Sequence, residues 1–288
     1  MAERVVTDSM IGLNLPDSAR LSRRVATVLG KNPSPFTGPG TNTYLIGVGR
    51  RPILLDTGQG VPIYPDLLAC ALREFCHGDE LDRIVLTHAH IDHVGGVRQV
   101  RERFGPLEVM KKPWPGHDDD AEPITPIDHG AEIAGDGATL VGVLTPGHAP
   151  DHLCYYLKEE RALFTGDLVL GAGTTVIPED DGDLGQYMDS LRSLLELDLE
   201  KIYPAHGPVI LDPKRKLKDY IAHRELRDRQ ILAALRGGPL EVMAIVRRIY
   251  TDVPEYLHRA AASSVRSHLE KLRTEGRVVE HESRYRLN

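Results

Sequence analysis

Short apolar runs separated by glycine and proline fill the first half of the chain. These runs are rich in Val, Ile, Leu and Tyr, which indicates β-strands, and Gly38-Pro39-Gly40 and Gly49 supply turns between the first of them. The strands are predicted at residues 23–29, 43–48, 52–56, 83–86, 107–110 and 138–144.

In the two gaps between the strands at 52–56, 83–86 and 107–110, apolar residues recur at helical spacing instead of strand spacing. Residues 63–77 carry apolar side chains at helical spacing after Pro65, and residues 94–100 form a second helical stretch. The length of 288 residues allows one large α/β domain, or one domain with an appendage.

The last part of the chain is mostly helical in pattern. It predicts three helices followed by a small hairpin, an order that is typical of a winged helix, a module that in other proteins places a helix on nucleic acid. The helices are expected at residues 213–235, 240–250 and 256–275, and the hairpin strands at 277–280 and 285–287.

Charge separates the same two parts. The net charge is −7, but residues 212–288 carry 17 Lys and Arg against 11 Asp and Glu, which is +6, and residues 1–211 therefore carry −13. Arg259, Arg266 and Arg273 recur every seven residues on one helix face. This stripe fits either a polyanion-binding surface or an ordinary solvated face.

Composition indicates a soluble protein. The apolar runs are far shorter than the ~20 residues that cross a bilayer, and residues 1–11 lack the apolar stretch of a signal peptide. We therefore expect a cytoplasmic protein with no membrane contact. Cys70, Cys76 and Cys154 form no CxxC pair, so neither a disulfide framework nor a thiolate zinc site is predicted.

The stretch Thr87-His88-Ala89-His90-Ile91-Asp92-His93 directly follows an apolar strand and concentrates possible metal ligands. In an extended segment His88 and His90 point the same way, because side chains repeat every two residues. Asp92 and His93 follow as the chain turns toward a helix, so they can face a second ion. Solvated loop histidines are the alternative, which four ligands in six residues disfavour.

Three more strand ends deliver a potential ligand through a Gly or Pro turn. They are Thr145-Pro146-Gly147-His148, Thr165-Gly166-Asp167 and Pro204-Ala205-His206-Gly207. We predict two coordination groups, with Asp167 bridging them. His88, His90 and His148 form the first group, and Asp92, His93 and His206 form the second. Three protein ligands with a shared water is the open pattern of a catalytic site.

Two further polar residues have open roles. Asp56 ends a strand beside Gly58, where it either orients the metal loop from behind the ligands or caps a turn. His152 lies four residues after His148 and is a candidate proton donor to the leaving group, or it packs a turn. Trp114 and His117 belong to a surface loop over 111–128 and either line a substrate mouth or anchor the connection.

The H-x-H-x-D-H stretch followed by His148, Asp167 and His206 resembles the metallo-β-lactamase superfamily. The resemblance implies an α/β fold, an αββα sandwich with a dinuclear site at one edge, here with a winged-helix-like C-terminal appendage. We expect an N-terminal segment over 1–22, the catalytic domain over 23–211 and the appendage over 212–288. Asp167 stands where the true zinc β-lactamases have Cys, which argues against β-lactam hydrolysis.

Finer features are similar to the lactamase-beta-like protein 2 family. They are Asn32-Pro33, Gly40-Thr41-Asn42-Thr43-Tyr44-Leu45, Gly171-Ala172-Gly173-Thr174-Thr175-Val176 and Tyr203-Pro204-Ala205-His206-Gly207-Pro208. Ala89 and Ile91 depart from the Trp and Arg of the animal members. The resemblance implies an endoribonuclease that cuts single-stranded RNA.

The expected chemistry is hydrolysis assisted by two zinc ions, with Mn²⁺ or Fe²⁺ as alternatives. They would lower the pKa of a shared water from about 15.7 toward about 7 and hold the resulting hydroxide for attack, with Asp92 orienting it. The expected substrate is single-stranded RNA, or else a small ester or thioester. A non-catalytic zinc-stabilised RNA-binding protein and an iron-dependent oxidation of sulfur compounds are further alternatives, and a homodimer is compatible with all of them.

Overall fold

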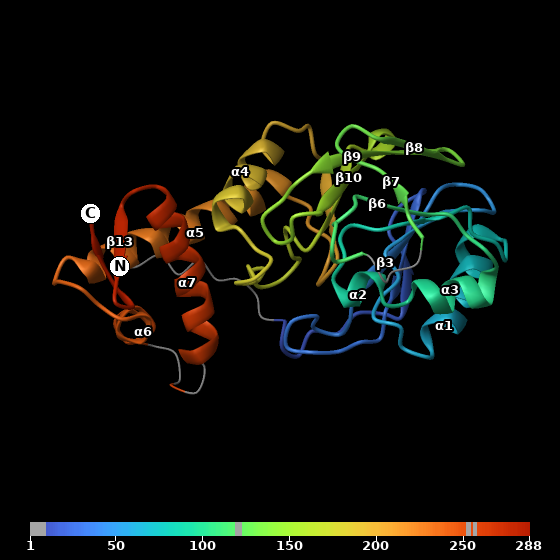
Figure 1. The fold of residues 1–288 in the computed structure, drawn as a ribbon. Coiled ribbons are helices and arrows are strands. Elements are labelled where there is room, and N and C mark those ends of the chain that lie inside the picture. Colours follow the sequence, from blue (N-terminus) through green and yellow to red (C-terminus); the bar gives the residue numbers. More distant parts are fainter. Residues whose placement is uncertain (1–9, 119–122, 252–254, 256–257) are drawn as a thin grey trace.

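Two β-sheets that face each other make up most of the molecule, as the computed structural model in Figure 1 shows. The structure describes residues 10–118, 123–251, 255 and 258–288. Helices cover the outer side of each sheet, and a helical module follows at the C-terminal end. The predicted αββα sandwich with a winged-helix-like appendage is therefore confirmed.

The first sheet has seven strands in sequence order, antiparallel from β1 to β4 and parallel from β4 to β7. These strands are β1 (Ser18–Arg20), β2 (Val25–Leu29), β3 (Asn42–Ile46), β4 (Ile53–Leu55), β5 (Ile84–Val85), β6 (Val109–Lys111) and β7 (Thr125–Pro126). Its outer face is covered by α1 (Tyr64–Ala71) with the π-helical turn η1 (Leu72–Cys76), and by α3 (Val97–Phe104), while the short α2 (Ile91–Val94) follows β5.

The second sheet has five strands in the order β12-β11-β10-β9-β8. They are β8 (Glu132–Gly135), β9 (Ala138–Leu144), β10 (Leu153–Leu157), β11 (Ala162–Gly166) and β12 (Lys201–Pro204), with the 3₁₀ turn η2 (Lys158–Glu160) between β10 and β11. Helices α4 (Leu184–Leu194) and the first half of α5 (Pro213–Leu235) cover its outer face.

Strands buried on both faces explain the lack of polar alternation in the sequence. Ile53 and Leu55 point into the core between the sheets, while Leu54 packs under α1 and α3. All three side chains are buried, so this strand reads as a continuous apolar run. The ends of the predicted strands and helices agree with the observed ones to within about four residues, the largest difference being at the end of α3.

The loop predicted over 111–128 is only partly irregular and only partly at the surface. Thr125–Pro126 forms β7, and the Lys111 ammonium is buried, 2.7 Å from Asp151 and 3.0 Å from Asp118. Sequence polarity suggested exposure because it does not reveal that a lysine has two carboxylate partners. Residues 119–122 of this prediction lie outside the described residues.

The C-terminal module has the predicted order of helices and hairpin. It consists of α5, α6 (Val242–Ile249), α7 (His258–Thr274) and the antiparallel pair β13 (Val278–His281) and β14 (Arg284–Leu287). The α5 helix contributes to two cores, through Leu217 and Tyr220 to the second sheet and through Ile231 and Leu235 to the C-terminal module. The boundary at residues 211 and 212 stays a prediction.

The arginine stripe on α7 is largely engaged in ion pairs. Arg266 lies 3.0 Å from Glu179 of the sandwich, and Arg273 lies 2.6 Å from Glu270 of its own helix. Arg259 is exposed. None of the helices in the described part of the chain is both long and apolar enough to cross a membrane.

A buried ion pair inside the C-terminal module gives a pH-dependent prediction. Asp228 accepts hydrogen bonds from His268 Nδ1 at 2.6 Å and from Lys271 Nζ at 2.8 Å. Burial alone would raise the pKa of Asp228, but these two hydrogen bonds outweigh it and lower that pKa. The carboxylate therefore stabilises the fold above its ordinary pKa, and this contribution is lost as the pH falls through the lowered value.

Asp228→Asn is expected to reduce the free energy of unfolding by about 1–3 kcal/mol at about pH 7, because both donors lose a charged acceptor. The difference from the wild type should shrink as the pH is lowered stepwise toward about pH 3. Denaturant unfolding at each pH measures it. A difference that stays constant over this range would contradict the assignment.

Candidate metal centre

The ends of β5, β9, β11 and β12 meet at one edge of the sandwich and carry the predicted ligands there. The loop after β5 is tied to the second sheet, because Leu153 N–H donates to Thr87 O at 2.9 Å. It is tied to the first sheet by Thr57, whose backbone N–H and hydroxyl both donate to His93 O at 2.8 Å. The histidine-rich stretch is therefore fixed on both sides.

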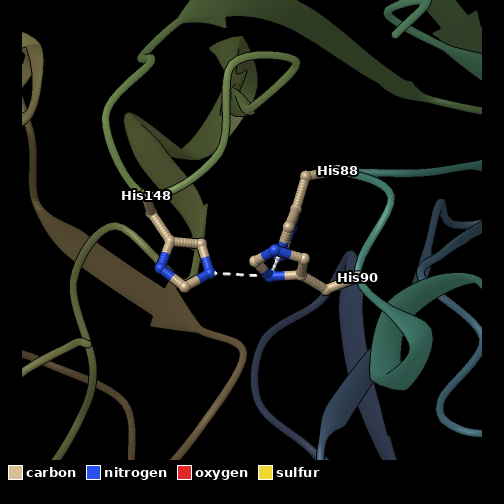
Figure 2. A group of neighbouring side chains, drawn as sticks. All are labelled: His88, His90 and His148. Carbon is tan, nitrogen blue, oxygen red and sulfur yellow. Dashed lines mark hydrogen bonds between the residues drawn. The ribbon is translucent and has the colours of Figure 1, made fainter. Parts of the chain in front are cut away.

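Three imidazoles converge in a first group. His90 Nδ1 lies 3.0 Å from His88 Nε2 and 2.9 Å from His148 Nε2. Figure 2 shows the three rings pointing toward one another. A tetrahedral ion with bonds of about 2.0–2.1 Å would hold such nitrogens about 3.3 Å apart. The spacing is therefore close to that of a three-histidine metal site.

Two carboxylates and two imidazoles form a second group. His206 Nε2 lies 3.3 Å from Asp92 Oδ2 and 3.0 Å from Asp167 Oδ1, and His93 Nε2 lies 3.5 Å from each of these oxygens. All four side chains thus offer one ligand atom to a common point.

Asp167 stands between the two groups. Its Oδ1 atom faces His93 and His206, while its Oδ2 atom lies 3.5 Å from His148 Nε2 of the first group. A carboxylate with one oxygen on each side is the arrangement of a bridging ligand. The structure thus brings together all seven side chains that the sequence singled out as ligands.

Buried atoms without partners support a cation at this place. Within the described residues, the buried His93 Nε2 and Asp167 Oδ1 make no hydrogen bond of good geometry, and they contact only other ligand atoms of the group as ion pairs. An unsatisfied buried polar atom is costly, so these two atoms fit a site that a metal ion completes.

Asp56 orients His93 from behind. Its carboxylate accepts from His93 Nδ1 at 2.8 Å and from Thr87 N–H at 2.8 Å, so the Nε2 atom of His93 is left for a metal. The backbone of Asp56 has a φ of 58°, a left-handed conformation that residues other than glycine rarely adopt. Asp56 therefore orients a ligand from behind, and it is not a simple turn cap.

The two groups differ in their electrostatics. Burial, together with the neighbouring imidazoles, holds the pKa of His88 well below its usual value, and burial lowers that of His148 to about 4. Burial also disfavours protonated His206, but Asp167 and Asp92 outweigh it and raise its pKa to about 9. The first group therefore presents neutral imidazoles. In the second group the two carboxylates hold protons on His206 and His93, whose pKa is also raised, and a metal ion that binds there would displace these protons.

The geometry does not support His152 as the proton donor. The ring is fully buried, its Nδ1 lies 2.9 Å from the Thr145 hydroxyl, and its Nε2 accepts from Asp167 N–H at 3.2 Å. Burial and His148 hold its pKa well below the usual value, so the ring carries no proton at Nε2 to give. His152 instead packs the turn and fixes the backbone of Asp167.

A cavity of about 630 Å³ opens onto both groups. Phe36, Ile91 and Val176 line it and are 69%, 62% and 48% exposed, so the mouth is largely apolar. Trp114 and His117 stack on each other with centroids 4.2 Å apart and do not line this cavity. His117 instead lines a neighbouring cavity, which His90 and Ile91 also line.

Sequence reasoning missed two residues at the start of β3 that support the ligands. Thr41 Oγ1 donates to Asp92 Oδ2 at 3.2 Å, and Asn42 Nδ2 donates to the carbonyls of Pro204 and Gly207 around His206. The Gly40–Leu45 motif contained both residues, but a motif alone gives them no role. Phe36 had no signal, because an isolated Phe in a turn reads as a surface residue.

Comparison with known proteins agrees with this architecture. Residues 36–206 match the metallo-beta-lactamase superfamily, and residues 242–286 match the beta-lactamase associated winged helix domain. The beta-lactamase-like protein 2 homolog of Caenorhabditis elegans is 41% identical over 91% of this chain and 88% of its own length. The lactamase-like protein nscB of Arthroderma benhamiae is 43% identical over 92% of this chain, but the match spans only 61% of that relative.

Solved structures have the same fold. A beta-lactamase domain protein from Burkholderia ambifaria aligns over 96% of both chains with a TM-score of 0.81 and 19% identity. TTHA1623, solved in a di-iron-bound form, aligns over 64% of this chain and 93% of its own with a TM-score of 0.51 and 29% identity. On the fold, the convergent ligands and these matches, the chain belongs to the metallo-β-lactamase superfamily.

Proposed function

We propose that this protein is a hydrolase that uses two metal ions and acts on esters or thioesters of apolar acids. The observation that carries the proposal is the pair of ligand groups joined by Asp167 and opening onto an apolar cavity. Two ions bound there would lower the pKa of a shared water and polarise the oxygen of the scissile bond. Zinc is the default for these ligands, with iron or manganese as alternatives.

The residues of the chain then have distinct tasks. His88, His90 and His148 would hold one ion, Asp92, His93 and His206 would hold the other, and Asp167 is placed to serve both groups. Asp92 also lines the cavity, and the Thr41 hydroxyl fixes its carboxylate, so it is suited to orient the attacking water.

The residues that line the cavity indicate which kind of leaving group the site can expel. Among the described residues that line it there is no lysine, arginine, tyrosine or cysteine, and His152 is buried behind Asp167. A thiolate, whose parent thiol has a pKa of about 8.5, can depart as a leaving group without a proton donor. An alkoxide is far more basic and needs one, so this lining favours a thioester.

The side chains at the mouth of the cavity indicate which kind of acyl group it accepts. Large apolar side chains at Phe36, Ile91 and Val176 suit an apolar chain or ring. Binding RNA along its backbone draws on cationic side chains that contact phosphates, and the described lining offers none.

Single-stranded RNA is the second candidate. The resemblance to the lactamase-beta-like protein 2 family and the +6 charge of residues 212–288 favour it. Phe36 could also stack on a base. It ranks second because Arg266 and Arg273 are paired with carboxylates, and Ser267 of α7 donates to Ile177 O of the sandwich, so this helix face is partly occupied.

Metal content tests the site itself. Purified wild-type protein is expected to hold two equivalents of metal by elemental analysis after dialysis. His88→Ala and His206→Ala should each lose about one equivalent, because each removes a ligand from a different group. His281→Ala, which changes an exposed histidine of β13, is the control and should keep both equivalents. Equal metal content in all four proteins would refute the two groups.

Thiol release tests the reaction. The wild type with metal should hydrolyse acyl thioesters, and Asp167→Asn should lower kcat/KM by about 10³-fold or more, since metal ions supply several kcal/mol of transition-state stabilisation. An unstructured RNA oligonucleotide is assayed in parallel. Cleavage of RNA without thiol release, lost in Asp167→Asn, would reverse the order of the two candidates.

The apolar mouth gives a third test. Phe36→Ser should lower kcat/KM for a long-chain acyl thioester by about 10-fold or more and barely affect an acetyl thioester, because burial of an aromatic side chain contributes about 1.5–3 kcal/mol. Kinetics on both substrates measure the ratio. An equal change in kcat/KM for the two substrates would mean that the acyl chain does not bind at Phe36.

A further inference from the structure

A segment between the bridging Asp167 and α4 connects the metal centre to the C-terminal module. Residues 170–178 form no helix or strand, and Leu170, Gly173, Thr174, Thr175, Val176 and Pro178 line the cavity over the metal ligands. We call residues 170–178 the cavity loop. It contains the whole Gly171–Val176 motif, for which the sequence offered no role.

Donors from the C-terminal helices reach the alternate carbonyls of the cavity loop. Three of them come from α5 and one from α7. They are Lys216 Nζ to Gly171 O at 3.4 Å, Tyr220 OH to Gly173 O at 2.9 Å, Arg224 Nη2 to Thr175 O at 2.6 Å and Ser267 Oγ to Ile177 O at 3.2 Å. We call these four contacts the donor ladder.

The order of the donors on α5 matches the order of the carbonyls in the loop. Lys216, Tyr220 and Arg224 are four residues apart, which places them on one helix face about 6.0 Å apart along its axis. They meet the carbonyls of Gly171, Gly173 and Thr175 in the same order along the chain. One face of α5 therefore serves one edge of the loop.

The other edge of the cavity loop faces the metal ligands. Val176 O accepts from His148 Nδ1 at 2.7 Å, which leaves His148 Nε2 for the ion. At its start, Gly171 N–H donates to His206 O at 2.7 Å. The loop thus contacts a ligand of each group, and its position sets the ring of His148.

Arg224 is the buried member of the ladder nearest His148. The residue is only 6% exposed, and its guanidinium carbon lies 5.5 Å from the ring centre of Tyr187. Tyr187 OH in turn donates to Leu168 O, next to Asp167. A buried charge that donates to Thr175 O fixes the carbonyl of the following Val176 through one peptide unit.

We propose that Arg224 is a positioning residue for the three-histidine site: through Thr175 and Val176 it holds His148 in its metal-binding orientation, so the C-terminal module is part of the metal centre. The proposal rests on the proposed two-metal function. Removal of a group that orients a ligand from behind costs about 10–100-fold in metal affinity.

The test measures zinc affinity in a His206→Ala background, where the three-histidine group dominates binding, by competition with a chromophoric chelator. Arg224→Met should raise the zinc dissociation constant about 10–100-fold. Arg224→Lys, which keeps a cationic donor for Thr175 O, should restore most of the affinity. Arg215→Met, on the exposed side of the same helix, is the matched control and should leave the affinity unchanged.

Tyr220→Phe provides an independent variant, because it keeps the packed ring and removes only the hydroxyl that donates to Gly173 O. It should weaken zinc binding by about 3–10-fold, less than Arg224→Met because its contact is farther from His148. Should Arg224→Met fail to fold, this variant and Arg224→Lys decide the question.

The outcomes separate the two proposals. Two zinc equivalents in the otherwise unchanged protein, with unaltered affinity in Arg224→Met and Tyr220→Phe, would overturn the positioning role and leave the metal centre standing. No zinc binding by the wild type would remove both proposals. Weaker zinc binding in both ladder variants, with Arg215→Met unchanged, supports the role of Arg224.

Discussion

The carboxylate of Asp167 is the point on which the two halves of the metal centre depend. Four strands from two sheets end at the same edge of the sandwich, and Asp167 contacts ligands of both groups there. Its backbone N–H is held by His152, and its buried Oδ1 has no hydrogen-bond partner within the part of the chain that the structure describes. The fold therefore concentrates negative charge at a largely buried edge, which is unfavourable unless cations neutralise it.

Local sequence patterns predicted the ligands because a metal ligand is recognised by its side-chain type and its spacing from other ligands. The spacing of His88 and His90 after an apolar strand, and the repeated strand-end turns before His148, Asp167 and His206, were sufficient to assign both groups. Most of the strands were found for the same reason, since apolar runs bounded by glycine and proline are local signals, but β1, β7, β8 and β10 were not predicted. Boundaries differed by a few residues where burial on both faces hid the ends of a strand.

The supporting contacts could not be predicted, because they involve backbone carbonyls and distant segments. Val176 O orients His148, and any residue at that position would present the same carbonyl. His152 looked like a proton donor by its distance in sequence from His148, but tertiary packing buries its ring against Thr145 and Asp167. Arg224 counted only as one positive charge in a basic tail, whereas the structure buries it against the sandwich. A net charge of a segment therefore says little about which charges face outward.

The continuity of α5 through two cores has a mechanical consequence. Its N-terminal half is packed under the five-stranded sheet and its C-terminal half inside the winged-helix module, with no break between Pro213 and Leu235. A rigid rod shared in this way leaves little room for hinge motion between the parts. Melting of either end removes packing from the other, so the chain should lose its structure in one cooperative step, and a truncation within this rod would compromise both halves at once.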